Sequence, residues 1–160
     1  MSVANPSARL LKEKLFWIVS RGALWCYGHA PVFGSLRVSI GIIRNANRVL
    51  VIRRNDGRGV SFPGGLAVPW ETDEQTLIRE VREETGLFCQ GFEFAFRYES
   101  RADIPVRIAV FHVQATGEIR GSWEGTPVWI EIAELREELL SSQQYVADRL
   151  LGSSTEHPER

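Results

Sequence analysis

The chain has 160 residues, of which 44% are hydrophobic and 24% are charged, and its formal net charge is −1. These values describe a single domain that can bury a sizeable core without disulfides or a structural metal. Because the charge is close to zero, the chain lacks the basic surface that duplex DNA or long RNA requires, and a small ligand is favoured over a nucleic-acid polymer. Cys26 and Cys89 form no Cys-x-x-Cys motif, which predicts the reducing cytoplasm as the compartment.

Residues 1–35 are predicted to be an N-terminal apolar helical extension. Residues 10–27 are rich in aliphatic and aromatic side chains but are interrupted by charged ones, Lys12 and Arg21 among them. The segment is too short and too charged to span a membrane, and it lacks the cleavage site of a signal peptide. Three interpretations stay open, in this order: a helix packed on the domain, a helix that forms a homodimer, and a helix in a membrane interface.

Two strands are predicted next, over residues 36–44 and 48–54, because both segments are rich in β-branched residues. Residues 45–47 between them suit a hairpin turn. Arg53 and Arg54 end the second strand, near the expected pocket. Either one of them contacts a substrate phosphate, or both are exposed charges at a strand end, and the two interpretations are equally supported.

A capped helix is predicted over about residues 73–85. Thr72 followed by Gln75 forms a capping box, and Gly86 suits the left-handed residue that ends a helix. The glycine-bounded turn at residues 63–65 precedes this helix, and it lets the backbone approach a metal or a phosphate closely.

The predicted helix presents an acidic face beside a buried one. At 100° per residue, an arc of about 100° contains three carboxylates, those of Glu80, Glu83 and Glu84. Their mutual repulsion is unfavourable on a bare helix, so a cation is expected to offset it. Carboxylate oxygens are hard ligands, which favours Mg²⁺, with Mn²⁺ as the alternative. A solvated Glu-rich helix face is the usual interpretation of such a segment, and the glycine turn before the helix argues against it here.

Alternating and β-branched apolar residues predict three further strands, over residues 88–98, 104–115 and 128–132. Two helices and a polar flexible tail are predicted in addition, over residues 133–140, about 143–151 and 152–160. This order of elements suits an α/β/α sandwich with a mixed β-sheet, in a domain that spans residues 36–151. Which strands pair parallel and which antiparallel stays open.

Residues 65–87, GLAVPWETDEQTLIREVREETGL, resemble the signature box of the Nudix hydrolases at every fixed position. Those enzymes cleave nucleoside diphosphates linked to another group. The order of segments over residues 36–151 is also similar to that family, and residues 40–54 resemble the mutator-type branch, which cleans oxidised nucleotides from the precursor pool. The resemblance implies a Nudix-type α/β/α sandwich and a divalent-metal-dependent pyrophosphohydrolase with a small nucleotide-like substrate.

The resemblance also implies metal ligands and an orienting arginine at matching positions. Three carboxylates and one backbone carbonyl would hold the cation, and one of the carboxylates would also act as the base: Glu80, Glu83, Glu84 and the carbonyl of Gly64. Arg79 would orient carboxylates, with Glu71 or Glu83 as its partner, instead of contacting substrate.

A fourth acid and two substrate contacts are expected outside the box. Glu124 best resembles the position from which the nucleotide-cleaning relatives supply a further acid; Glu118 is its rival, and a solvated loop acid is the alternative. Arg107 either projects into the substrate cleft or faces solvent from the sheet. Trp70 stands where many family members have glycine, and it either stacks on a base or packs against its own domain.

Three functions stay open for the chain. The favoured one is hydrolysis of the phosphoanhydride in a nucleoside triphosphate or in a nucleoside diphosphate linked to another moiety. ADP-ribose, nucleotide sugars and dinucleoside polyphosphates are the alternative substrates. A non-catalytic nucleotide-sensing Nudix domain is the alternative of another class, although such domains often lose box acids that this chain retains.

Overall fold

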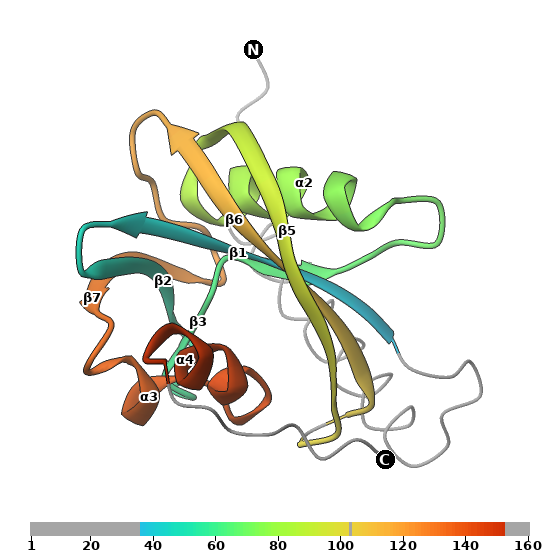
Figure 1. Ribbon diagram of the computed structural model, residues 1–160. Helices are drawn as coiled ribbons and strands as arrows, with labels where there is room; N and C mark the ends of the chain where they lie inside the picture. Colours follow the sequence, from blue (N-terminus) through green and yellow to red (C-terminus); the bar gives the residue numbers. More distant parts are fainter. Residues whose placement is uncertain (1–35, 103, 153–160) are drawn as a thin grey trace, which may run out of the picture. The chain divides into compact units, whose positions relative to one another are not determined.

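A mixed β-sheet covered by helices forms the described part of the chain (Figure 1). The computed structural model describes residues 36–102 and 104–152. Helix α2 (Asp73–Thr85) packs on one face of the sheet, while α3 (Leu135–Glu138) and α4 (Gln144–Leu150) pack on the other. The predicted α/β/α sandwich with a mixed sheet is therefore confirmed. No helix within these described segments combines the length and apolarity that crossing a membrane requires.

The predictions for residues 1–35 and 153–160 concern parts of the chain outside the described residues. They include the apolar helical extension, its packed, homodimeric and membrane-interface interpretations, and nearly all of the polar tail. Each of these stays a prediction.

The central strand of the sheet is β1 (Leu36–Asn45). It pairs parallel with β6 (Val106–Thr116) and antiparallel with β2 (Arg48–Arg54). Strand β5 (Phe88–Ser100) pairs antiparallel with β6, and β7 (Gly125–Glu131) pairs antiparallel with β2. The predicted hairpin and the predicted second pair of strands are confirmed, while β7 begins before residue 128, where its start was predicted.

Two short strands that the sequence pattern does not predict shape the loop before α2. Strand β3 (Val60–Ser61) pairs with β2, and β4 (Gly64–Leu66) pairs with β1. Both are too short for a hydrophobic period to be visible. The β4 pairing places Gly65 opposite Ser39, so the glycine turn lies directly against the central strand.

Helix α2 has the predicted limits and caps. The Gln75 backbone N–H donates to Thr72 Oγ1 over 3.2 Å, and the Thr72 N–H donates to the Gln75 side-chain oxygen over 2.9 Å. Gly86 ends the helix in the left-handed region, at φ 74°. Leu77 and Val81 are fully buried against the sheet. Their burial fixes the rotation of the helix, and with it the direction of the acidic residues.

The first C-terminal helix is shorter than predicted. Instead of residues 133–140, α3 covers only Leu135–Glu138, and the 3₁₀ turn η1 (Ser141–Gln143) separates it from α4. After α3 the chain becomes extended, and the Leu140 N–H donates to the carbonyl oxygen of Val60 over 3.0 Å. A contact with the distant strand β3 thus ends the helix, which explains why the local sequence predicts a longer one.

Candidate active site

Two glycines bring the loop before α2 against the acidic residues of that helix. Gly64 has φ 149°, and a Cβ there would lie 2.1 Å from the carbonyl oxygen of Ser39, so only glycine fits. The Gly64 N–H donates to Glu84 Oε2 over 2.7 Å. A Cβ at Gly65 would lie 2.5 Å from Glu80 Oε1. The loop backbone therefore contacts two acids of α2 directly.

Arg79 holds three acids with one guanidinium group. Its Nε and Nη2 donate to the two carboxylate oxygens of Glu71, over 2.8 and 2.9 Å. Its Nη1 donates to Glu80 over 2.6 Å and to Glu83 over 3.3 Å. The hydrogen bonds from Arg79 are the largest cause that lowers the pKa of Glu71 to about 2. Arg79 thus contacts both acids named for it from the sequence, and Glu80 in addition.

Glu80, Glu84 and Glu124 form a cluster of acids beside the glycine turn. Glu84 is 4% exposed. Burial raises the pKa of Glu84 well above its ordinary value, the negative charges of Glu124 and Glu80 add to the rise, and the Gly64 N–H opposes it. Burial also raises the pKa of Glu80, and the charge of Glu124 adds to that shift. The charge of Glu124 therefore disfavours ionisation of both Glu80 and Glu84.

Glu124 reaches this acid cluster from the loop before β7. The Asn55 backbone N–H donates to the Glu124 carbonyl oxygen over 3.0 Å, and the Asn55 side chain donates to the Trp123 carbonyl oxygen over 2.9 Å. The end of β2 thereby holds this loop in place. The rival Glu118 instead forms an exposed ion pair with Arg120 at 2.6 Å. The geometry favours Glu124 as the fourth acid.

The acid cluster fits a divalent cation by its chemistry. Carboxylates that repel one another, one of them buried, are stabilised by an opposite charge, and their oxygens are ligands that Mg²⁺ and Mn²⁺ accept. Within the described segments, no three acidic, histidine or cysteine side chains are already arranged as metal ligands. Arg79 donates one hydrogen bond to Glu80 and one to Glu83, so both carboxylates keep free lone pairs for a cation.

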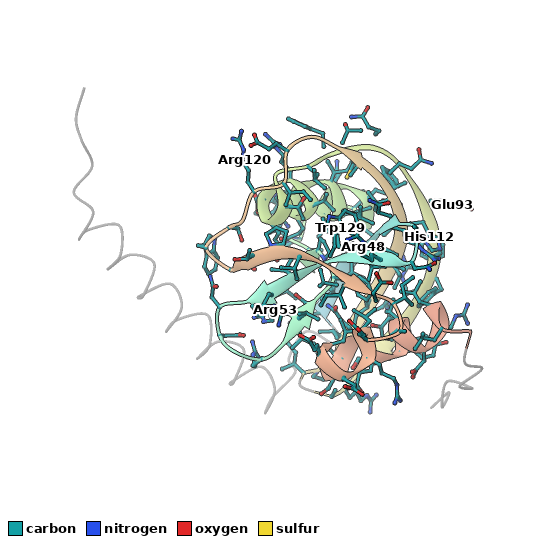
Figure 2. The ribbon with its side chains drawn as sticks, turned by 90° about the vertical axis from the view of Figure 1, so that its left-hand side faces the viewer. Arg48, Arg53, Glu93, His112, Arg120 and Trp129 are labelled. Atoms are coloured by element: carbon teal, nitrogen blue, oxygen red, sulfur yellow. The ribbon has the colours of Figure 1, made fainter. Side chains whose placement is uncertain are left out.

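Of the two arginines that end β2, Arg54 lies nearer to the acid cluster. It donates to both oxygens of Asp56, over 3.1 and 2.8 Å. The hydrogen bonds to Asp56 raise the pKa of Arg54, and the charge of Glu124 adds to this shift. Arg53, at the end of β2 (Figure 2), instead forms an exposed ion pair with Glu138 at 2.7 Å. We therefore expect Arg54 to be the arginine that faces a substrate phosphate.

Asp56 is a residue of this region that the sequence interpretation missed. Hydrogen bonds from Arg54, and further ones from Arg58, hold its pKa far below the ordinary range. Asp56 stands in an Asn-Asp-Gly sequence, which is typical of a turn, so the pattern alone indicates only a turn residue. The sequence signal that could have identified Asp56 is the pair of arginines two residues before and after it, Arg54 and Arg58.

Arg107 and Trp70 lie apart from these contacts. Arg107, on β6, is half exposed and forms an ion pair with Glu99 of β5 at 3.3 Å. Trp70, in the loop before α2, is 81% exposed, which contradicts the interpretation that it packs against its own domain. The substrate roles expected for Arg107 and Trp70 stay predictions.

A surface cleft of about 320 Å³ adjoins Glu83 at the C-terminal end of α2. Arg82, Phe88 and Arg120 line it, and Figure 2 shows Arg120 at the edge of the molecule. The Glu83 side chain is 61% exposed, whereas Glu84 is buried beneath the glycine turn. Of these two neighbouring acids, Glu83 is therefore the one that solvent and a ligand can reach first.

Gly65→Ala is expected to lower turnover more than stability. The added Cβ would displace the flexible Glu80 carboxylate, while Gly65 itself has no positive φ that requires glycine. We expect kcat to fall about 10-fold and the thermal midpoint to change little. Gly91→Ala on β5 is the matched control, because its Cβ would meet nothing closer than 3.8 Å. A Gly65→Ala protein as active as the control would contradict the close contact with Glu80.

The metal-free protein is expected to lose stability through Glu84 as the pH rises. The pKa of this carboxyl is raised in the folded protein above its ordinary value of 4.5, so folding retains a proton that the unfolded chain releases. This contribution is fully present below about pH 4.5 and is lost as the pH rises toward the folded pKa. Urea unfolding in EDTA between about pH 5 and 8 measures it as the difference between the wild type and Glu84→Gln. Equal pH dependence of the two proteins would contradict it.

The fold and these contacts together define a class of protein, the divalent-metal-dependent hydrolases of phosphoanhydrides. Phosphoryl transfer to water requires little covalent chemistry from a protein; it requires neutralised charge and a positioned water molecule. Clustered carboxylates around a cation supply both.

Comparison with known proteins then identifies the family. Residues 35–150 match the family model of the NUDIX domain, and the chain belongs to the Nudix hydrolases. It is 33% identical over 97 residues to the 8-oxo-dGTP diphosphatase of Escherichia coli (strain K12), in an alignment that covers 58% of this chain and 70% of that protein.

Two further similarities concern a shorter segment and the fold. The chain is 44% identical over 50 residues to an ADP-ribose pyrophosphatase of Methanocaldococcus jannaschii, which covers 29% of this chain and 30% of that protein. The fold is similar to the solution structure of the E. coli ORF135 protein, with a TM-score of 0.65 and 22% identity, over 79% of this chain and 96% of that one.

Proposed function

We propose that this Nudix hydrolase uses Mg²⁺ to cleave nucleoside triphosphates into nucleoside monophosphates and pyrophosphate, and that oxidised deoxynucleoside triphosphates are among its substrates. The observation that carries the proposal is the cluster of the buried Glu84 with the partly buried Glu80 and Glu124 beside the glycine turn. The similarity to an 8-oxo-dGTP diphosphatase supports the oxidised substrate. We also propose the cytoplasm as the compartment, which the cysteine pattern supports.

In the proposed mechanism the acids of α2 bind the cation. Its ligands would be three carboxylates and a backbone carbonyl, from Glu80, Glu83, Glu84 and Gly64. The bound cation supplies neutralisation of negative charge and a lower pKa of the attacking water. The Gly64 N–H fixes one oxygen of Glu84, which leaves the other oxygen available as a ligand. Arg79 would keep Glu80 and Glu83 near their working positions from the side away from substrate.

Arg54 and Glu124 would serve the substrate side of the reaction. Arg54 carries a permanent positive charge next to the acid cluster, and its hydrogen bonds to Asp56 orient the guanidinium group. It would steady non-bridging phosphate oxygens. Glu124 would complete the charge of the site from the opposite loop, and one of the cluster acids would accept the proton of the attacking water.

Hydrolysis of ADP-ribose is the second candidate function. The similarity to an ADP-ribose pyrophosphatase supports it. That similarity covers less than a third of either chain, whereas the alignment with the 8-oxo-dGTP diphosphatase covers more than half of this one. We therefore place nucleoside triphosphates first.

A panel of substrates separates the candidates. The full chain is incubated with Mg²⁺ or Mn²⁺ and with each of the ordinary nucleoside triphosphates, 8-oxo-dGTP, ADP-ribose, nucleotide sugars and dinucleoside polyphosphates, and the products are identified. We expect the highest kcat/KM for nucleoside triphosphates, with the oxidised one preferred. A higher kcat/KM for ADP-ribose would establish the second candidate instead. Turnover of none of them would favour the nucleotide-sensing alternative.

A further inference from the structure

Ser39 on strand β1 carries a hydroxyl group with no role in the fold. The residue is completely buried. Among the buried side-chain polar atoms of the described residues, its Oγ is the one without a hydrogen-bond partner. A buried hydroxyl without a partner lowers stability, and alanine would fill the same position without that cost. A serine at this position is therefore explained best by a hydrogen-bond partner other than those of the present structure.

The sheet register places Ser39 beneath helix α2. Side chains on a strand alternate between faces, so Ser39 shares a face with Gly41. A Cβ at Gly41 would lie 3.1 Å from Leu77 and 3.4 Å from Val81, both on α2. The Ser39 side chain thus points toward α2, on the side of the sheet that carries the acids.

Ser39 also lies opposite Gly65 in the antiparallel β1–β4 pair. Paired residues of this kind have their Cβ positions about 4.5–5.5 Å apart on one face. The Cβ position of Gly65 is 2.5 Å from Glu80 Oε1 and 3.0 Å from Glu80 Oε2. Because residue 65 is glycine, no side chain at that position separates the Ser39 hydroxyl from the Glu80 carboxylate across the strand pair.

The hydrogen bonds of Glu80 leave one of its oxygens for this hydroxyl. In the described part of the chain, Arg79 Nη1 donates to Oε1 over 2.6 Å. A single hydrogen bond on Oε1 leaves the carboxylate free to rotate about that oxygen, and it leaves lone pairs for a cation. A second hydrogen bond, on Oε2, would fix the plane of the carboxylate that Arg79 holds by Oε1 alone.

We propose that Ser39 is a positioning residue for the metal site: when a cation is bound, its Oγ–H would donate to Glu80 Oε2 and fix the orientation of that carboxylate. This proposal rests on the proposed function only in taking Glu80 as a metal ligand. Hydrogen bonds from such outer residues orient a ligand and raise metal affinity. Ser39 would touch neither substrate nor cation.

The test is Mn²⁺ binding to the full chain without substrate, measured by calorimetry. Ser39→Ala and Ser39→Cys remove the strong donor, and we expect both to bind Mn²⁺ about 10-fold more weakly than the wild type. Ser39→Thr keeps a hydroxyl and is expected to restore binding. Ser61→Ala, a buried serine on β3, is the matched control and should bind as the wild type does. Thermal midpoints of Ser39→Ala at or above that of the wild type would show that the fold is intact.

Wild-type Mn²⁺ affinity in Ser39→Ala and Ser39→Cys would overturn the proposal. If Ser39→Thr does not fold, the Mn²⁺ affinities of Ser39→Ala and Ser39→Cys, compared with that of the wild type, still test the proposal. A wild type that binds Mn²⁺ but hydrolyses no nucleotide would refute the proposed function alone, because the Ser39 comparison remains valid. A wild type that binds no Mn²⁺ would overturn both.

Discussion

Glu84→Gln is expected to lower kcat at least about 100-fold and, in the absence of metal, to raise the thermal midpoint at pH 8. Glutamine keeps the size of the side chain and an oxygen that can accept from the Gly64 N–H. It removes a proposed metal ligand, which would account for the lost turnover. It also removes a buried carboxyl that burial and the charges of Glu124 and Glu80 disfavour as an anion, which accounts for the gained stability.

The two opposite effects of Glu84→Gln distinguish a metal ligand from a structural residue. The measurements are kcat with saturating Mg²⁺, on the triphosphate that the substrate panel identifies, and a thermal melt in EDTA. Glu93→Gln is the control, since Glu93 is an exposed acid on β5 beside His112 (Figure 2). Full activity in Glu84→Gln would refute the ligand assignment, and a lowered thermal midpoint would refute the account of the buried charge.

Arg79→Ala is expected to impair both turnover and stability. The side chain donates to Glu71, Glu80, Glu83 and the carbonyl oxygen of Leu66. Without it, Glu80 and Glu83 lose their orientation, and we expect kcat to fall about 10- to 100-fold. The ion pairs with these acids are lost as well, so the urea midpoint at pH 7 should also fall.

The pH dependence of Arg79→Ala follows from the pKa of Glu71. Arg79 lowers this pKa to about 2, so the pair stabilises the folded protein above the ordinary value of 4.5 and loses that effect as the pH falls through 2. In Arg79→Ala the difference between the urea midpoints at pH 7 and at low pH should shrink. Arg79→Lys keeps the charge but not the planar fork, and its kcat should lie between those of the wild type and Arg79→Ala.

A control and a contradicting result complete this test. Arg136→Ala removes another arginine that is paired with a carboxylate. Arg136 lies on α3, and its Nε donates to Asp148 Oδ1 on α4 over 2.6 Å. It should leave kcat unchanged. If Arg79→Ala kept the kcat of the Arg136→Ala control, the orienting role of Arg79 would be wrong.

The features of the site that depend on residues close together in the sequence could be predicted from it. The capping pair Thr72 and Gln75 and the terminal Gly86 define α2 within one segment, and the helical period places its acids on one face. Arg79 and its partners also belong to that segment. Local rules therefore suffice for the helix and for most of the acid cluster.

Contacts between distant segments account for what the sequence could not show. The short strand β4 exists because residues 64–66 pair with β1, and α3 ends early because Leu140 bonds to Val60. The choice of Glu124 over Glu118 depends on Asn55 holding the loop before β7. Ser39 gains its meaning only from the register that sets it opposite Gly65. None of these pairings leaves a period or a spacing in the sequence.

The central claim is that this Nudix hydrolase splits nucleoside triphosphates at a cation held by the acids of α2. Its most direct test is product analysis of 8-oxo-dGTP incubated with the full chain in EDTA and after addition of excess Mg²⁺. We predict no turnover in EDTA, and equal amounts of nucleoside monophosphate and pyrophosphate once Mg²⁺ is present. Undiminished turnover in EDTA, or no product from this or any other nucleotide with Mg²⁺, would contradict the claim.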